Sequence, residues 1–366
     1  MKFLILTCNT GGGHHTAAAA ISEYFTAQGH TCVTMDCLDF LSPTKAKLIS
    51  EGHVFLYRNA PKLFGMGYRF EEEHTPKFIL KQCEAYADDF YQTVQTVQCD
   101  AVIHVHIFCA LIMTAAKQRH PLNLPGFYVA TDYGPPPGTG FVDLDAVFLP
   151  HRSLLPAFAQ TGLPEEKLVP SGIPVRHAFC TGIPKNEARQ RLGLPLSGKL
   201  VLLTCGSMGA GPMEELAVLL DQDLPANATL AVICGTNEKL QQSLERARLS
   251  NRIRIYGYVQ DMSFYMDAAD LILTKAGGLA TTEALMKRLP LVYINAVPGC
   301  ETRNLEFMVR NNYAVTAETP KELSLLVRSL LQDDQELQAW KKRLAEGFPD
   351  IAVKIMYDYI VQHYMK

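Results

Sequence analysis

The chain has 366 residues, of which 48% are hydrophobic and 19% charged, and its formal net charge is −3. This composition excludes a disordered chain and fits one or two globular domains with a sizeable core. The small charge gives no general reason to bind nucleic acid. The ten cysteines show no CxxC pair and no zinc-site spacing, so we expect a reducing cytoplasm, with neither a disulfide framework nor a structural metal.

Strand-like apolar runs alternate with helical patterns along the first half of the chain. Strands are predicted at residues 3–8, 31–35, 101–107, 126–130 and 146–149, and helices at 16–27 and 109–117. This alternation indicates parallel strands joined by helical crossovers. The longest apolar stretch, 101–116, falls short of the roughly 20 residues that span a bilayer. We therefore expect any membrane contact to be peripheral.

A second series of the same kind begins at Lys199. Strands are predicted at residues 200–205, 229–234, 253–256, 271–274 and 291–294, with helices at 213–220 and 339–366. The sequence therefore predicts two Rossmann-like, doubly wound α/β domains in tandem, with the ligand cleft between them. We assign residues 1–172 to an N-terminal domain, 173–345 to a C-terminal domain, and 346–366 to a helix that packs back toward the N-terminal domain.

A glycine-rich loop, NTGGGHH at residues 9–15, joins the first strand to the first helix. Gly12 and Gly13 allow a ligand to approach the backbone closely, although a glycine turn between strand and helix often serves only tight packing. The histidines break the GxGxxG dinucleotide pattern, which disfavours hydride chemistry. His14 stands near a helix start, where the dipole disfavours the imidazolium and leaves a neutral ring able to accept a proton.

Three further features of the first half are candidate site residues. Two of them have two interpretations each, and the third is rejected. Asp132 follows a predicted strand and either acts as or orients a base, or it forms an Asx-turn. His106 is either a site residue or a satisfied core histidine. The DLD at residues 143–145 precedes a strand and lacks a glycine loop, so we reject it as a metal site.

The second half repeats the strand, glycine loop and helix design at LVLLTCGSMGAG, residues 200–211. Ser207 is placed either to donate its hydroxyl to a phosphate oxygen or to cap the following helix. The tripeptide at residues 257–259 follows another strand, where Tyr258 is able to lie against a base.

The stretch 274–304, TKAGGLATTEALMKRLPLVYINAVPGCETRN, joins two ligand loops to one helix start. The Gly277-Gly278 turn opens a helix whose N–H groups and dipole face an anion, while Glu283 is able to accept diol protons. A second loop, 298–304, brings Glu301 and Asn304 to the same sheet edge. Together these features predict a nucleotide-sugar pocket.

Residues 45–81 interleave seven basic residues with six aromatic ones. Such a mixture suits a membrane interface, where rings enter the acyl boundary and cations meet anionic headgroups. An ordinary amphipathic helix pair on the sheet explains the pattern equally well.

Taken in order, GGGHHTAAAAI, TD at 131–132, SGIPV at 171–175, CGSMG at 205–209, GYV at 257–259, TKAGGLATTEAL and PGCETRN resemble one family over nearly the whole chain. It is the family of monogalactosyldiacylglycerol synthases and processive diacylglycerol glucosyltransferases. The lipid-linked N-acetylglucosaminyltransferase of peptidoglycan synthesis is a more distant relative. Two departures are Cys300, where the family usually has Gln, and Ala276, where it usually has Pro.

The resemblance implies a GT-B fold and an inverting, metal-independent transfer of a hexose from a UDP-sugar to a membrane lipid, most directly diacylglycerol. His14, with Asp132, becomes the base, and the acceptor lies near Gly12, Gly13 and His106. The implied donor-binding residues are Gly206, Ser207, Met208, Tyr258, Val259, Lys275, Gly277, Gly278, Leu279, Thr282, Glu283, Gly299, Cys300, Glu301 and Asn304.

Within that donor set, Ser207 and the Gly277-Gly278 turn would hold the diphosphate, Glu283 the ribose, the segment 258–259 the uracil, and Glu301 with Asn304 the sugar. No cofactor is expected beyond the UDP-sugar co-substrate, and the enzyme is expected in the cytoplasm, peripheral on the inner face of the membrane. Two alternatives stay open: a UDP-sugar epimerase of the same fold, and a non-catalytic nucleotide-sugar sensor.

Overall fold

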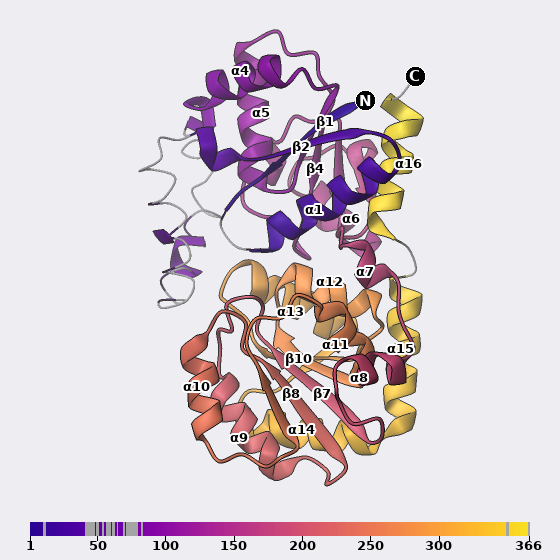
Figure 1. The fold of residues 1–366 in the computed structure, drawn as a ribbon. Coiled ribbons are helices and arrows are strands. Elements are labelled where there is room, and N and C mark those ends of the chain that lie inside the picture. The colour runs from indigo at the N-terminus through magenta and orange to yellow at the C-terminus, as the bar shows by residue number, and fades with distance from the viewer. Residues whose placement is uncertain are drawn as a thin grey trace. The chain divides into compact units, whose positions relative to one another are not determined.

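The structure is a computed structural model. It describes residues 1–9, 12–40, 83–348 and 351–364, together with 48, 51–52, 55, 60, 63, 65–68, 70 and 80–81. The chain forms two compact units, which are treated separately (Figure 1). Unit 1 comprises Met1–His177, Val297–Arg303 and Asp350–Lys366, and unit 2 comprises Ala178–Ala296 and Asn304–Pro349. The predicted domain bounds stay a prediction.

The described part of unit 1 is built on a six-stranded parallel sheet in the order β2-β1-β3-β4-β5-β6. Its strands are β1 (Lys2–Thr7), β2 (Thr31–Asp36), β3 (Ala101–His104), β4 (Gly126–Val129), β5 (Ala146–Leu149) and β6 (Leu168–Pro170). Every residue of β3, β4 and β5 is buried, as expected for parallel strands covered on both faces.

Helices α1 and α16 lie on one side of this sheet, and α4 and α5 lie on the other (Figure 1). The helices of unit 1 are α1 (Gly12–Ala27), α4 (Ala87–Val97), α5 (Ile107–Arg119), α6 (Leu155–Ala159) and α16 (Ala352–Tyr364), with short 3₁₀ turns η1 (Cys37–Phe40), η2 (Thr139–Phe141), η3 (Arg152–Leu154) and η4 (Glu165–Lys167). The short helix α7 (His177–Cys180) stands where the chain passes from one unit to the other.

Unit 2 repeats this architecture in the residues that the structure describes, with a six-stranded parallel sheet in the order β12-β11-β10-β7-β8-β9. Its strands are β7 (Lys199–Thr204), β8 (Ala228–Ile233), β9 (Ile253–Tyr256), β10 (Leu271–Lys275), β11 (Leu291–Asn295) and β12 (Ala314–Thr316). Its helices are α8 (Lys185–Arg191), α9 (Met213–Asp223), α10 (Glu238–Arg246), α11 (Met262–Ala268), α12 (Gly278–Met286), α14 (Pro320–Gln332) and α15 (Asp334–Gly347), and α13 (Cys300–Arg310) belongs to it from Asn304 onward.

Local sequence explains several of these elements. In α10, the buried residues Leu240 and Leu244 are one turn apart, so one face packs on the sheet while the rest stays polar. Helix α14 begins at a capping box in which the Thr319 side chain accepts from the N–H of Glu322, and the Glu322 side chain accepts from the backbone of Thr319. The leucine spacing in α10 determines which face of that helix is buried, and the capping box of α14 determines where that helix starts.

Four predicted bounds are wrong. The first helix begins at Gly12 rather than Thr16, because glycine costs little in a first turn. The third strand ends at His104, since the fully apolar run hides the change from strand to helix. The predicted loop 298–304 becomes helix at Cys300. The predicted final helix 339–366 divides into α15 and α16.

Each sheet reverses its direction of growth at one place. In unit 1 the chain runs from β1 outward to β2 and then returns to the other side of β1 with β3. In unit 2 it runs from β7 through β8 to β9 and then returns to the other side of β7 with β10. Ligands of open α/β sheets bind beyond the carboxyl ends of the strands at such switch points.

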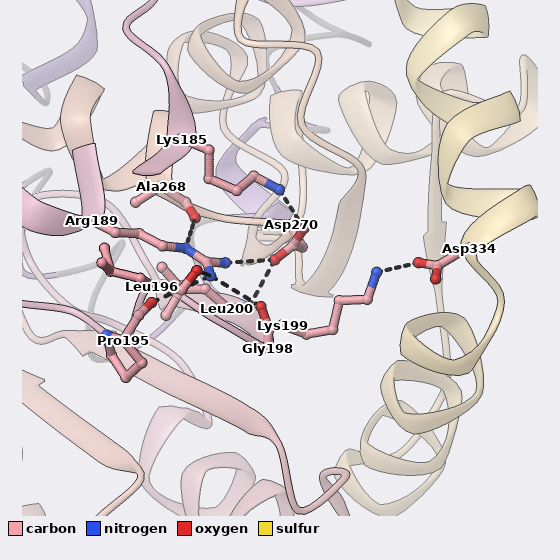
Figure 2. A network of polar contacts seen from close by, with 10 residues as sticks. All are labelled: Lys185, Arg189, Pro195, Leu196, Gly198, Lys199, Leu200, Ala268, Asp270 and Asp334. Carbon is pink, nitrogen blue, oxygen red and sulfur yellow. Dashed lines mark hydrogen bonds and ion pairs between the residues drawn. The ribbon is translucent and has the colours of Figure 1, made fainter. Parts of the chain in front are cut away.

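A buried ionic network secures the opposite edge of the unit 2 sheet (Figure 2). Asp270, just before β10, accepts hydrogen bonds from the backbone N–H of Leu200 at 2.9 Å, from Arg189 at 2.9 Å and from Lys185 at 2.5 Å. The Arg189 guanidinium also donates to the carbonyl of Ala268 at 3.0 Å. The network ties α8 to the amino ends of β7 and β10.

The stretch 45–81, interpreted above as a membrane interface or a helix pair, lies largely outside the described residues. Among the residues that the structure does describe, no helix combines the length and the apolar character needed to cross a membrane.

Candidate active site

His14 lies at the switch point of unit 1, where its imidazole ring makes two polar contacts. Its Nδ1 atom is 2.9 Å from the carbonyl oxygen of Val105 and 3.1 Å from the hydroxyl oxygen of Thr131. Val105 follows β3 and Thr131 follows β4, while His14 stands in the first turn of α1. Three successive parts of the sheet edge therefore converge on one imidazole.

These contacts determine which ring nitrogen carries the proton in neutral His14. A backbone carbonyl only accepts, so the short contact with Val105 requires a hydrogen on Nδ1. The lone pair then resides on Nε2, which is the atom able to take a proton from a hydroxyl group. The structure thus gives His14 the tautomer that a general base needs.

His106 lies beside His14 and caps α5. The two rings meet edge to face with their centroids 4.7 Å apart. The Nδ1 atom of His106 accepts from the N–H of Phe108 at 3.1 Å, so this half-buried histidine is the N-cap of α5, and its role as a site residue stays a prediction. The core histidine of this run is His104, whose pKa burial lowers to about 3, with a further contribution from the charge of Lys117.

The remaining predicted residues of unit 1 lie around this pair. Gly12 and Gly13 form the beginning of α1, one turn of helix that includes His14. Asp132 is half buried and directly follows Thr131. Burial, and then the charge of Asp132, raises the pKa of Tyr128, which lies in β4. Sequence reasoning missed Thr131, which the TD pair could have suggested.

At the switch point of unit 2, a tight glycine turn follows β7. Gly206 and Gly209 have φ angles of +66° and +55°, in the region that favours glycine. A Cβ atom at Gly209 would lie 2.0 Å from the carbonyl oxygen of Cys234. The backbone N–H of Thr236 donates to the Ser207 carbonyl at 2.8 Å. The loop after β8 therefore clamps the turn in place.

Ser207 is exposed at the tip of this turn, next to the half-buried Met208. The alternative role as a helix cap is wrong, because α9 begins at Met213 with Pro212 at its N-cap position. The turn thus presents the Ser207 side chain outward, while its carbonyl is occupied by Thr236.

Across the switch point, β10 ends in Lys275 and the start of α12. The Lys275 side chain reaches the glycine turn, since its Cε atom lies 3.3 Å from where a Cβ of Gly206 would be. Gly277 is the N-cap of α12 and supplies no side-chain cap, and the first turn of this helix carries no acidic residue. A cation, a serine and an uncapped helix start therefore meet at one place, which favours a phosphate.

The hydroxyls of α12 have partners inside the protein. Thr282 donates to the carbonyl of Gly278 at 2.8 Å, and Thr281 shares a 2.8 Å hydrogen bond with the Tyr293 hydroxyl. Glu283 follows them on the same helix and is half buried. These bonds rigidify the helix start that faces the switch point.

Tyr258 and Val259 follow β9, farther along the same sheet edge. The Tyr258 side chain is 64% exposed, and Val259 is half buried. The position and the exposed ring are compatible with stacking against a base.

The last predicted group is divided between the units. Gly299, Cys300 and Glu301 belong to the short segment of unit 1, and Asn304 belongs to unit 2. Glu301 is 3% exposed and accepts from the N–H of Val297 at 2.9 Å. Asn304 is fully buried and donates to the carbonyl of Ala276 at 2.9 Å. Both side chains therefore shape the loops after β10 and β11.

Two family models match the chain, one for each half. Residues 14–175 match monogalactosyldiacylglycerol (MGDG) synthase, and residues 200–355 match the glycosyltransferase family 28 C-terminal domain.

Curated relatives match nearly the whole chain. The chloroplastic monogalactosyldiacylglycerol synthase of Spinacia oleracea is 28% identical over 98% of this chain and 72% of its own length. A processive diacylglycerol beta-glucosyltransferase of Bacillus cereus (strain B4264) is 24% identical over 94% of this chain and 89% of its own length.

Solved structures share the fold. MurG of Acinetobacter baumannii has a TM-score of 0.64 at 17% identity and covers 99% of both chains. HepE of Anabaena, in complex with UDP, has a TM-score of 0.61 at 16% identity and covers 100% of both chains. These neighbours and the two parallel sheets confirm the predicted GT-B class of α/β fold. The resemblance that the motifs predict is therefore confirmed: residues 14–175 match the monogalactosyldiacylglycerol synthase model, residues 200–355 match the glycosyltransferase family 28 C-terminal domain, and the curated relatives are a monogalactosyldiacylglycerol synthase and a diacylglycerol glucosyltransferase.

Proposed function

We propose that this glycosyltransferase moves a hexose from a UDP-sugar to a hydroxyl group of a membrane lipid, most directly diacylglycerol, with inversion at the anomeric carbon. The names of the relatives support the acceptor class, since the spinach protein is a monogalactosyldiacylglycerol synthase and the Bacillus protein a diacylglycerol beta-glucosyltransferase. The HepE complexes with UDP and UDP-glucose support the donor class.

The observation that carries the proposal is the position of His14. Its Nδ1 contacts the Val105 carbonyl and Thr131, so the lone pair of the neutral ring lies on Nε2, the atom that we assign as the proton acceptor. In the proposed step, Nε2 takes the proton of the lipid hydroxyl while that oxygen attacks the anomeric carbon and UDP departs from the opposite side. Asp132 and His106 complete the acceptor side of this site.

The donor is proposed to bind at the switch point of unit 2. Ser207, Lys275 and the N–H groups of the first turn of α12, which begins at Gly278, contact the diphosphate and stabilise its charge as UDP leaves. Glu283 binds the ribose and Tyr258 the uracil, while Glu301 and Asn304 hold the loops that contact the sugar. This assignment uses backbone dipoles and one lysine for the leaving group, so transfer is expected to need no metal ion.

The proposed acceptor also implies where the protein works. A lipid hydroxyl lies at the membrane interface, so we place the protein at the inner face of the cell membrane, bound peripherally from the cytoplasm.

UDP release from a panel of UDP-hexoses, with EDTA present and with or without diacylglycerol in mixed micelles, tests this function. Release that depends on the lipid, and that survives EDTA, is expected for one UDP-hexose. Equal release without lipid contradicts transfer to a lipid, and absence of release with every donor contradicts the donor assignment.

A further inference from the structure

Three cysteine side chains and one aspartate gather beside the first sheet edge, although they come from separate parts of the sequence. Cys8 follows β1, Asp36 ends β2, Cys37 begins η1, and Cys109 lies in the first turn of α5. Thr7 and Asp36 are paired in register between β1 and β2, which brings the residues after each strand together. Parallel pairing of two strands thus produces a cluster that the spacing of these residues in the sequence does not predict.

The ligand-type atoms of this cluster are close to one another. The Sγ atoms of Cys8 and Cys37 and a carboxylate oxygen of Asp36 all lie within 4.8 Å of one another. The Cys37 thiol is also within hydrogen-bond reach of Cys109, whose Sγ donates to the Thr7 carbonyl at 3.3 Å. A tetrahedral zinc site with two sulfur ligands has its ligand atoms about 3.5 Å apart, so rotamer adjustments of a few tenths of an ångström to about one ångström suffice.

His15 stands on the accessible side of the cluster, next to Asp36, and its imidazole joins the three closely spaced ligand atoms through a side-chain rotation toward the thiols. The Nε2 atom of His15 is 3.7 Å from the Oδ2 atom of Asp36, and its side chain is 42% exposed. Cys8 and Cys37 are 2% and 1% exposed, so the thiols form the closed end of the site. An ion therefore has an entry side at His15 and Asp36 and a sulfur-lined interior.

We propose that Cys8, Asp36, Cys37 and His15 bind one thiophilic divalent cation of the Zn²⁺ type. Two thiolates, a carboxylate and an imidazole suit zinc, whereas hard cations such as Mg²⁺ and Ca²⁺ prefer oxygen ligands alone. On binding, the two thiols lose their protons to the solvent and the ion takes both thiolates. Cys109, in contact with the Cys37 sulfur, acts as an outer hydrogen-bonding partner.

The ion would join three elements that surround the glycine loop. Cys8 stands at the end of β1, Asp36 and Cys37 join β2 to η1, and His15 belongs to the first turn of α1. His15 directly follows His14, so an occupied site would also fix the helix turn that carries the proposed base. The ion itself takes no part in the transfer step, and its binding is measured without any sugar or lipid.

The test titrates the reduced full-length chain with Co²⁺ and Zn²⁺. We expect one equivalent of Co²⁺ to produce thiolate-to-cobalt charge-transfer absorption, which one equivalent of Zn²⁺ abolishes. Zinc should also raise the unfolding temperature, because it binds the folded chain. Absence of the charge-transfer band, or a stoichiometry of zero after dialysis, overturns the proposal.

Variants assign the ligands. Cys37→Ser and Asp36→Asn should each weaken zinc binding by at least about 10-fold, the lower end of the effect known even for outer partners. Asp36→Asn is the conservative choice, since the asparagine oxygen can still accept from the N–H of Leu38, as Asp36 does at 2.9 Å. It therefore removes the charge while preserving the local fold.

The matched control is Cys32→Ser. Cys32 lies on β2 like Asp36, but its thiol contacts Thr26 and Ser22 instead of the cluster. Its zinc affinity should stay within about twofold of the wild type, well inside the effect of losing a ligand. Equal losses of zinc affinity in Cys32→Ser and Cys37→Ser contradict the assignment.

Discussion

The two switch points have the same topology but use different parts of the chain for chemistry. In unit 1 the edge is built around side chains, with the His14 ring held between the Val105 carbonyl and Thr131. In unit 2 the edge is built around the backbone, with Gly206 and Gly209 at positive φ and the uncapped start of α12. One repeated architecture thus presents a titratable group in unit 1 and oriented N–H groups in unit 2.

This difference suits the two substrates of a transfer reaction. A hydroxyl acceptor must lose a proton, which requires a side chain with a suitable lone pair. A departing diphosphate needs only stabilisation of its charge, which backbone dipoles and a lysine supply. Side-chain substitutions should therefore dominate in unit 1, and backbone conformation should dominate in unit 2.

The largest effect is expected from His14→Ala. Removing the base should lower the turnover number by about 10²- to 10⁴-fold while the affinity for UDP stays the same. Initial rates of glycolipid formation and calorimetric UDP binding measure the two quantities. His363→Ala, on the exposed end of α16, is the control and should keep full activity. If the turnover number of His14→Ala fell by less than threefold, the interpretation that a side chain of unit 1 acts as the base would be wrong.

The next effect concerns the opposite edge of unit 2, where Asp270→Asn leaves Arg189 buried without its anion. We expect the free energy of unfolding to fall by about 3–5 kcal/mol, with UDP affinity of the folded protein unchanged. Chemical denaturation and UDP binding provide the readouts. Weaker UDP binding in a fully folded variant would show that the two edges of this sheet are not independent.

Asp270 also predicts a pH dependence of stability. Burial raises its pKa, but hydrogen bonds from Lys185 and Leu200 and the nearby positive charges lower it more, so the net pKa lies below the ordinary value. Because the folded pKa is depressed, the stabilisation is complete above about pH 4 and is lost as the pH falls through the folded pKa. Between pH 7 and 3, wild-type stability should therefore fall more steeply than that of Asp270→Asn.

Gly209→Ala tests the backbone interpretation of unit 2. The added Cβ meets the Cys234 carbonyl oxygen at 2.0 Å, so the turn must move. We expect UDP binding to weaken by about 10-fold, equivalent to ~1.4 kcal/mol. Gly193→Ala is the matched control, since Gly193 has a φ angle of +63° but nothing within 4 Å of an added Cβ. If Gly209→Ala and Gly193→Ala weakened UDP binding equally, the conformation of the turn at Gly209 would have no specific role in binding UDP.

The smallest effect is expected from Thr131→Val. This change removes one of the two contacts to His14 Nδ1 and keeps the Val105 carbonyl. Loss of one such hydrogen bond, about 0.5–1.5 kcal/mol, should lower turnover by about 2- to 10-fold, with Thr131→Ser restoring it. Measurement of the turnover number and of KM for the lipid decides this, because a purely structural role would not be rescued by serine.

The sequence predicted the fold class and most strands of both sheets, because buried parallel strands are short apolar runs between glycine loops. It misplaced the junctions at His106 and Cys300, where strand or loop gives way to helix. Periodicity carries no signal inside a run that is apolar on every face, and a histidine cap resembles a core histidine in sequence. The helix starts near His106 and Cys300 are recognised only from the hydrogen bonds of the folded chain.

The candidate site was predictable where residues follow a strand directly and was not where the fold joins distant segments. The positions of His14, Ser207 and Gly277 follow from strand, loop and helix order. The contact of Thr131 with His14 and the cluster of Cys8 with Cys37 depend on strand order, which places β3 and then β4 on one side of β1 and β2 on the other. Spacing rules for zinc sites consider ligands that are near one another in sequence, so they do not detect this cluster.

The anomeric configuration of the product tests the central claim most directly. The wild-type chain would be incubated with its UDP-hexose and diacylglycerol, and the purified glycolipid analysed by proton NMR. Deprotonation by His14 and displacement in a single step predict a β-linked hexose from the α-linked donor. An α-linked product, or free hexose without glycolipid, would contradict the account.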